Sequence, residues 1–246
     1  MRGFLLLLVL LVAGCSSIDP MFKEMPPYAP DVAPDDFVAG IDNPYLPFVA
    51  GATWTYYIGA PEDFEERIEL VVLAQPKDIL GVQATVVRDT VYGPGGAIIE
   101  DTHDWFAQDK DGNVWYLGEE TCEYEGGQCI DTGGSFQWGV DGALPGIVMH
   151  ADPQPGEPYY QEYYAGEAVD RAEVMGRGES VTTPLGAFTD TVRTREWNPL
   201  HPDEVERVFY VRGIGVVIKG VYDDGRFDEP ETLYSYDVPG FGSGTA

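Results

Sequence analysis

The stretch Asp101–Glu119, which reads DTHDWFAQDKDGNVWYLGE, constrains the fold of this chain more than any other. In its first half the side chains alternate, so that Trp105 and Phe106 face opposite sides of an extended strand. The run Val114–Leu117 alternates in the same way. Between the two runs stands Asp111–Gly112, a pair that favours a tight hairpin turn because glycine adopts positive φ without strain. The stretch therefore predicts a β-hairpin.

The whole chain has the composition of a strand-and-turn protein. Aromatic residues make up 13% of its 246 residues, and its 30 glycines and 19 prolines favour strands and turns over helices. No window keeps a helical period for more than about three turns. We therefore predict an all-β protein, built as one large domain or two smaller ones.

Matching residues recur in the same order in the two halves of the chain. The matched pairs are Gly51 and Gly156, Gly81 and Gly186, Val87 and Val192, Arg88 and Arg193, and Trp105 and Tyr210. These matches favour a two-fold internal repeat, and the alternative is one meander in which the same turn chemistry recurs. We assign residues 37–150 to the first repeat, 151–240 to the second and 241–246 to a flexible tail.

Each repeat is expected to contain five sequential strands joined by short turns. They fall at residues 53–58, 65–74, 82–91, 102–108 and 114–120 in the first repeat, and at 159–165, 167–176, 187–197, 204–212 and 216–222 in the second. Sequential strands with short connections form antiparallel meanders. Without a covering helix, two such meanders bury their apolar faces by forming a curved sheet, a barrel or a sandwich.

The N-terminus carries an export signal. The apolar run at residues 4–13 is too short to span a bilayer and fits a signal peptide at residues 1–14. It ends in Val-Ala-Gly before Cys15, which resembles the lipobox of bacterial lipoproteins and implies lipidation of that cysteine; the alternative is an ordinary signal peptide with a chance cysteine. Residues 15–36 are rich in proline and predict a tether. Because Ser16 replaces the aspartate that signals inner-membrane retention, we expect an exported protein anchored in the outer membrane or at the cell surface.

Charge limits the partners of the protein. The chain has 42 acidic and 14 basic residues and a formal net charge of −28 at pH 7. Such a surface repels nucleic-acid phosphates and anionic lipid headgroups. We therefore expect no nucleic-acid partner, and contact with the membrane through the N-terminal lipid alone. An excess of acidic residues is also typical of organisms with an acidic proteome. In that case the negative charge is a property of the whole protein surface and is not directed at one partner.

Cys122 and Cys129 remain once Cys15 is assigned to the lipid. The intervening Glu-Tyr-Glu-Gly-Gly-Gln is a turn by composition, and a hairpin would bring the two sulfurs within disulfide reach. An exported protein meets an oxidising compartment, so we predict a disulfide. The alternative, a metal-binding pair, lacks a second Cys or His pair at ligand spacing.

The turn of the central hairpin offers oxygen ligands for Ca²⁺. Asp109, Asp111 and Asn113, with Glu119 further on, supply the carboxylate and amide oxygens that this cation prefers. Glycine stands fourth in this run rather than sixth, so the run is not an EF-hand. The alternative is a solvated hairpin tip, and we expect no other cofactor.

Two stretches resemble a widespread group of uncharacterised bacterial exported β-proteins that includes lipoproteins. They are DWFAQDKDGNVWY, and PLGAFTDTV followed by FYVRGIGVV, and the similarity extends over about residues 43–236. The resemblance implies a curved antiparallel sheet and no established activity. The chain is more loosely similar to the half-barrel periplasmic lipoprotein carriers, which hold acyl chains on a concave sheet, but it has no evident lid helix.

The sequence contains no HExxH, GxSxG or P-loop motif. We therefore favour a non-enzymatic envelope protein that binds an apolar or amphiphilic ligand, or a protein partner. Trp54, Trp105 and Trp115 would line the ligand site or fill the core. The alternatives are a secreted hydrolase that works through carboxylates, and a carbohydrate-binding or adhesion module. Two convergent buried carboxylates would favour the hydrolase, and a flat exposed aromatic row the adhesion module.

Overall fold

The computed structural model describes residues 25, 27–223 and 226–246. The predicted signal peptide and the predicted lipidation site Cys15 lie outside these residues. Within the described ranges the regular secondary structure is strand, apart from one short 3-10 turn at Pro34–Asp36, so the all-β prediction is confirmed. None of the described segments forms a helix long and apolar enough to cross a bilayer.

Nineteen strands are present in the described part of the chain, and all of them belong to one antiparallel sheet. The first ten are β1 (Phe37–Val38), β2 (Thr53–Ala60), β3 (Asp63–Val72), β4 (Lys77–Ile79), β5 (Val82–Tyr92), β6 (Ile98–Asp109), β7 (Val114–Glu125), β8 (Gln128–Asp131), β9 (Phe136–Gln137) and β10 (Leu144–Met149). The others are β11 (Tyr159–Tyr160), β12 (Glu162–Tyr163), β13 (Arg171–Thr183), β14 (Gly186–Asn198), β15 (His201–Val211), β16 (Gly215–Asp223), β17 (Arg226–Phe227), β18 (Glu231–Val238) and β19 (Gly242–Thr245).

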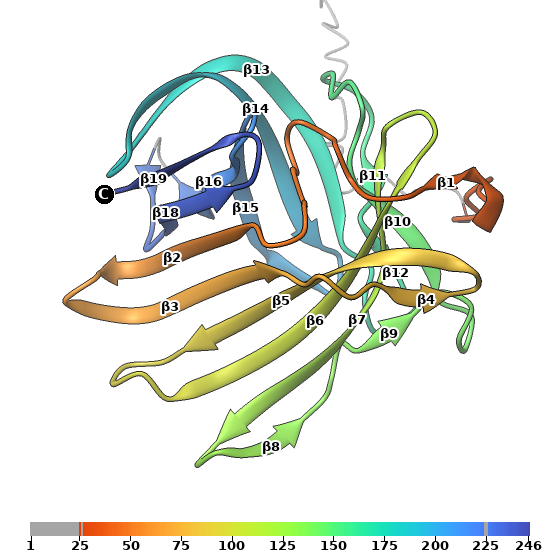
Figure 1. Cartoon of the computed structure of the whole chain (residues 1–246), viewed down its shortest axis with the longest axis horizontal. Coiled ribbons are helices and arrows are strands. Elements are labelled where there is room, and N and C mark those ends of the chain that lie inside the picture. Colours follow the sequence, from red (N-terminus) through yellow and green to blue (C-terminus); the bar gives the residue numbers. More distant parts are fainter. Residues whose placement is uncertain (1–24, 26, 224–225) are drawn as a thin grey trace, which may run out of the picture.

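The sheet curls into a nearly closed, barrel-like shape (Figure 1). One meander runs through β2, β3, β5, β6 and β7, and a second through β13, β14, β15 and β16. Strand β18 joins them on one side, because it pairs with both β16 and β2. On the other side β10 pairs with β7 and with β12, while β11 pairs with β13. The short segment Tyr159–Tyr163 therefore closes the ring.

Most predicted strands lie close to observed ones, but the strand predicted at residues 167–176 is observed at Arg171–Thr183, and the one predicted at 159–165 is the two short strands β11 and β12. The predicted flexible tail, 241–246, contains β19, which pairs with β18.

The two-fold repeat is not confirmed. On the inner face Val87 pairs with Asp104, whereas its proposed counterpart Val192 pairs with Tyr210. Trp105, the proposed counterpart of Tyr210, packs in a different hydrophobic cluster. Because side chains alternate with a period of two, a one-residue offset between the halves places matched residues on opposite faces.

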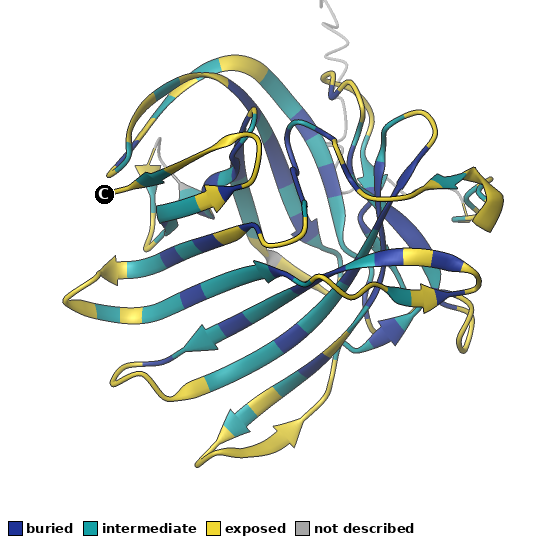
Figure 2. Ribbon diagram, viewed as in Figure 1, coloured by how far each residue is buried: buried dark blue, intermediate teal, exposed yellow. Residues whose placement is uncertain are grey.

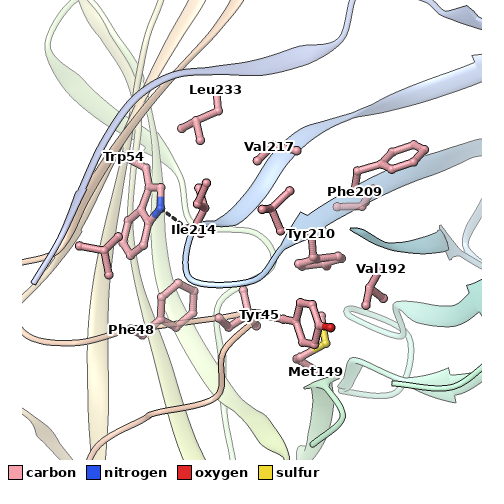
Figure 3. Packing of buried hydrophobic residues seen from close by; sticks show 14 of the residues in the cluster. Tyr45, Phe48, Trp54, Met149, Val192, Phe209, Tyr210, Ile214, Val217 and Leu233 are labelled. Carbon is pink, nitrogen blue, oxygen red and sulfur yellow. Dashed lines mark hydrogen bonds between the residues drawn. The ribbon is translucent and has the colours of Figure 1, made fainter. Parts of the chain in front are cut away.

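The side chains of the main hydrophobic cluster pack against one another in the interior (Figure 3). Residues 41–49, here called the plug segment, enter it with Tyr45 and Phe48. The plug segment is fixed by hydrogen bonds because its backbone would otherwise be buried without partners. The Gln108 side chain accepts bonds from the Asp42 and Asn43 backbone N–H groups at 3.0 and 2.9 Å. Buried Trp54 donates its indole N–H to the Ile214 carbonyl at 2.6 Å.

A second hydrophobic cluster lies on the outer side of β4 to β7. It contains Trp105, Trp115 and Trp138, and partly buried Phe37 packs against it. Because apolar side chains of these strands are buried on both faces, this part of the sheet is darker in Figure 2 than the exposed hairpin tips.

The predicted central hairpin is confirmed, since β6 and β7 pair antiparallel on either side of the Asp109–Asn113 turn. Gly112 has the positive φ, 94°, that this turn requires. The predicted disulfide is also present: Cys122 on β7 is bonded to Cys129 on β8, with their Cα atoms 5.7 Å apart. The disulfide therefore closes the exposed tip of the neighbouring hairpin.

Candidate functional site

A cavity of about 460 Å³ opens inside the sheet beyond the main hydrophobic cluster. We call it the acidic cavity, because among the described residues eight carboxylates and one cation, Lys219, line it. The carboxylates are those of Asp89, Asp104, Glu119, Glu162, Asp170, Glu196, Glu204 and Glu206. Its apolar wall is formed by Phe48, Leu70, Val87, Phe106, Val148 and Trp197.

Strand alternation explains why the acids converge. On β5 the inward positions run from Val87 to Asp89, and on β6 from Phe106 to Asp104. Adjacent inward positions on one strand are about 7 Å apart, so one step along a strand leads from the apolar end of the interior to the acidic end. The same change occurs on β15, where Val208 packs in the main hydrophobic cluster and Glu206 lines the cavity.

Asp104 and Glu119 meet at the hydroxyl of Tyr116. The Tyr116 oxygen lies 2.5 Å from Oδ1 of Asp104 and 2.9 Å from Oε2 of Glu119. A tyrosine hydroxyl has one proton to donate, so both bonds form together only if one carboxyl group is protonated and donates in return. Burial raises the pKa of Asp104 to about 6, and burial followed by the charge of Asp104 raises the pKa of Glu119 to about 7. The trio therefore holds a proton near neutral pH.

The opposite wall of the cavity has a second group of acids. Asn198 donates to Asp170 at 3.0 Å, and the Tyr210 hydroxyl donates to Glu196 at 2.9 Å. Burial, followed by the charge of Glu196, raises the pKa of Asp170 to about 6. Burial, followed by the charge of Asp170, also raises the pKa of Glu162 well above its usual range. Asp170 and Glu162 resist full ionisation because each one is poorly hydrated and lies beside another carboxyl group.

Lys219 lies at the edge of the cavity and pairs with Glu231 across β16 and β18 at 2.9 Å. The charge of Glu231 raises the pKa of Lys219 more than burial lowers it, so this lysine stays protonated. Its charge also partly offsets the effect of burial on Asp89 and Glu206. One lysine nevertheless faces eight carboxyl groups in the described lining, which leaves the cavity short of positive charge.

One carboxylate oxygen of Asp89 accepts no hydrogen bond from the described residues. This oxygen, Oδ1, is buried, although the residue as a whole is only half-buried because it also borders the cavity. Burial, followed by the charge of Asp104, raises the pKa of Asp89 well above its usual value. A buried polar atom without a partner costs free energy that a bound donor would recover.

The structure separates Glu119 from the other three predicted calcium ligands, which stay together in the hairpin turn. Both carboxylate oxygens of Asp109 accept bonds within the hairpin, from the backbone of Asp111 and from the Asn113 and Trp115 side chains among others. Glu119 lies instead in the acidic cavity, on Tyr116. In the described ranges no group of three or more His, Cys, Asp or Glu side chains is arranged to hold a metal ion. Calcium binding at this turn stays a prediction.

The three predicted ligand-lining tryptophans are all buried. Trp54 packs in the main hydrophobic cluster, and Trp105 and Trp115 pack in the outer one. None of the three is among the described residues that line the acidic cavity. Trp138 and Trp197 are also at most 8% exposed, so the tryptophans form no exposed row of the kind that a carbohydrate-binding surface uses.

Sequence reasoning missed the acids of the cavity, apart from Glu119. In a chain with 42 acidic residues, adjacent carboxylates are expected by chance. A signal was nevertheless present in two predicted strands, where an acidic residue stands two positions from a valine and therefore on the same face of the strand. The pairs are Val87 with Asp89 and Val208 with Glu206. A charged residue on the apolar face of a strand is unusual and indicates a buried polar site.

The chain was compared with known proteins at the level of sequence and fold. No protein-family model and no curated protein matches it. Among solved structures, it is similar to a crystal structure described as that of a putative lipoprotein from Parabacteroides distasonis. The two are 13% identical with a TM-score of 0.38, and the match covers 77% of this chain and 94% of the other.

Proposed function

We propose that this chain is a non-enzymatic binding protein of the bacterial envelope, and that its acidic cavity takes a small organic cation with an apolar portion. The observation that carries the proposal is the lining itself, in which eight carboxyl groups and one lysine of the described chain surround a cavity with an unpartnered Asp89 oxygen. An acidic cluster without a ligand is costly because its members repel one another.

A bound ammonium group would reverse this cost. It would donate hydrogen bonds to carboxylates and neutralise part of their charge, which favours their ionised form. The wall of Phe48, Leu70 and Phe106 would contact the hydrocarbon portion of the same ligand. A volume of about 460 Å³ lies in the range of small-molecule sites. Anionic ligands are disfavoured by the same carboxylates.

Calorimetric titration with n-butylammonium, and with butanesulfonate as its anionic counterpart, tests this proposal. At pH 8 we expect the cation to bind and the sulfonate not to bind. Binding of the cation should weaken at pH 5, because Asp104 and Glu119, with pKa values of about 6 and about 7, are then protonated.

The neighbouring residues Glu119 and Glu120 supply matched variants, since Glu119 lines the cavity and Glu120 is exposed. Glu119→Gln should weaken binding by about thirtyfold or more, the usual consequence of removing one partner of a buried charge pair. Glu120→Gln should leave binding unchanged. Equal affinities in the two variants, or equal binding of the sulfonate, would contradict the proposal.

A carboxylate hydrolase is the second candidate, and the Asp104, Tyr116 and Glu119 trio favours it. Two carboxyl groups with raised pKa values on one tyrosine hydroxyl resemble the acid and base of a glycosidase. Turnover of a panel of nitrophenyl glycosides that disappears in both Asp104→Asn and Glu119→Gln would replace the binding proposal with this one.

We also propose that a lipid on Cys15 anchors the protein, supported by the lipobox-like sequence before it. A triacylated cysteine would give stable membrane attachment, because several acyl chains anchor a protein stably whereas a single chain binds the membrane only marginally. Cys15→Ser, or globomycin treatment of the wild type, should leave an unprocessed precursor. If Cys15→Ser protein is processed and stays in the membrane fraction like the wild type, the anchor is elsewhere.

A further inference from the structure

A second cavity, of about 530 Å³, lies at the plug end of the sheet. We call it the apolar chamber, because Ile41, Phe48, Val49, Val72, Leu73 and Pro76 form much of its lining. Gln83, Thr85 and Gln108 complete its inner wall. The proposed binding of a small cation in the acidic cavity does not use this chamber.

The apolar chamber and the acidic cavity lie end to end on the same inner surface. On β3, Leu70 lines the cavity and Val72, two residues on, lines the chamber. On β5 the corresponding pair is Val87 and Thr85.

On β6 the pair is Phe106 and Gln108. Residues two apart on a strand point to the same face and are about 7 Å apart. On each of these three neighbouring strands, two successive inward-facing residues therefore line the acidic cavity and the apolar chamber in turn.

Phe48 is the side chain that borders both spaces. Its ring lies 4.9 Å from that of Phe106 and 5.8 Å from that of Trp54, measured between centroids. It belongs to the plug segment rather than to a strand of the sheet, so moving it breaks no ladder hydrogen bond. Displacement of one aromatic side chain would therefore join the two spaces.

We propose that the apolar chamber and the acidic cavity are two parts of one site for a long-chain alkylammonium amphiphile, with Phe48 as the partition between them. The ammonium head occupies the acidic cavity, and the hydrocarbon chain passes Phe48 into the apolar chamber. This inference rests on the proposed binding of cations in the acidic cavity, and it names the class of ligand that the complete site takes.

A chain-length series tests the partition. Titration with n-butylammonium, n-hexylammonium, n-octylammonium and n-decylammonium below their micelle concentrations compares wild type with Phe48→Ala. Each methylene buried in the chamber should strengthen binding by up to about fourfold. In Phe48→Ala we expect affinity to rise by about 100-fold or more from butyl to decyl, and by clearly less in the wild type, where the chain must displace Phe48.

Two further variants test whether the effect of chain length depends on Phe48 and on the apolar chamber. Phe241→Ala removes an exposed phenylalanine and should behave like the wild type. Adding Thr85→Trp to Phe48→Ala fills the chamber, so it should abolish the gain with chain length while leaving butylammonium affinity equal to that of Phe48→Ala alone.

The outcomes separate the two proposals. If butylammonium binds but affinity in Phe48→Ala does not rise with chain length, or rises equally in the wild type, the partition is wrong and the cation site stands. If butylammonium binds to none of the folded proteins, the cation site fails, and the amphiphile site fails with it.

Discussion

Raising the pH from 5 to 8 should lower the free energy of unfolding of this protein by about 3 kcal/mol or more. Burial raises the pKa of Glu119 from 4.5 to about 7, and that of Asp104 from 3.8 to about 6. Between about pH 4 and pH 7 the folded state therefore binds more protons than the unfolded state, so stability falls as pH rises through this window. Each unit of raised pKa corresponds to about 1.4 kcal/mol, which makes Glu119 alone worth about 3 kcal/mol.

Urea unfolding at pH 5, 6, 7 and 8 measures this effect. The net charge of −28 also opposes folding at high pH, so the series is run in about 1 M NaCl, which screens surface charges but not buried ones. Glu119→Gln should be more stable than the wild type at pH 8 and should flatten the profile. Exposed Glu120→Gln should follow the wild type. A wild-type stability that is constant or rises from pH 5 to 8 would show that the cavity acids do not carry raised pKa values.

Lys219→Met should destabilise the fold by about 1–2 kcal/mol at pH 8, because the pair with Glu231 is only partly buried: the lysine side chain is 40% exposed, so solvent screens part of its charge. The side chain of Glu231, 13% exposed, would lose its partner at 2.9 Å. Asp89 and Glu206 would also lose the positive charge that partly offsets their burial. The loss should be smaller at pH 5, because Asp104, whose pKa burial raises to about 6 and the charge of Lys219 partly lowers, is then largely protonated and has no charge for the lysine to offset.

Two variants identify the cause of the Lys219 effect. Adding Glu231→Gln to Lys219→Met should recover part of the stability at pH 8, because the orphaned charge is removed. Lys110→Met, at an exposed lysine bonded to the Asp35 carbonyl, should have little effect. A Lys219→Met loss of equal size at pH 5 and pH 8 would indicate lost packing rather than lost charge.

Local pattern was enough to predict most of the long strands, but not β10 (Leu144–Met149) or β18 (Glu231–Val238), which link the two meanders. Alternation and turn residues placed the central hairpin, and the glycine at position 112 has the φ that its turn needs. The disulfide followed from a turn between Cys122 and Cys129. These features depend on residues near one another in the chain, where periodicity and turn chemistry are informative.

The candidate site depends on contacts between distant segments, and pattern alone did not reveal it. Glu119 was expected beside Asp109 as a calcium ligand, but the face on which it lies turns it toward Asp104 and Tyr116. The other wall includes Asp170, directly before β13, and Glu196 on β14 of the second meander. Nothing local in either half predicts that two walls of acids meet, because their meeting requires the sheet to curl and close.

The pairing of β18 with β2 has a consequence for how the chain folds. Tyr56 on β2 pairs with Leu233 on β18. One of the first strands to be synthesised therefore cannot complete its pairing until one of the last has been made. Until then the edge of β2 has unpaired backbone groups that other chains can bind. Contacts of such long sequence separation slow folding, since a long loop must close before they form. The ring is thus completed only after almost the whole chain has been made, and the half-finished sheet is the species most exposed to misassembly.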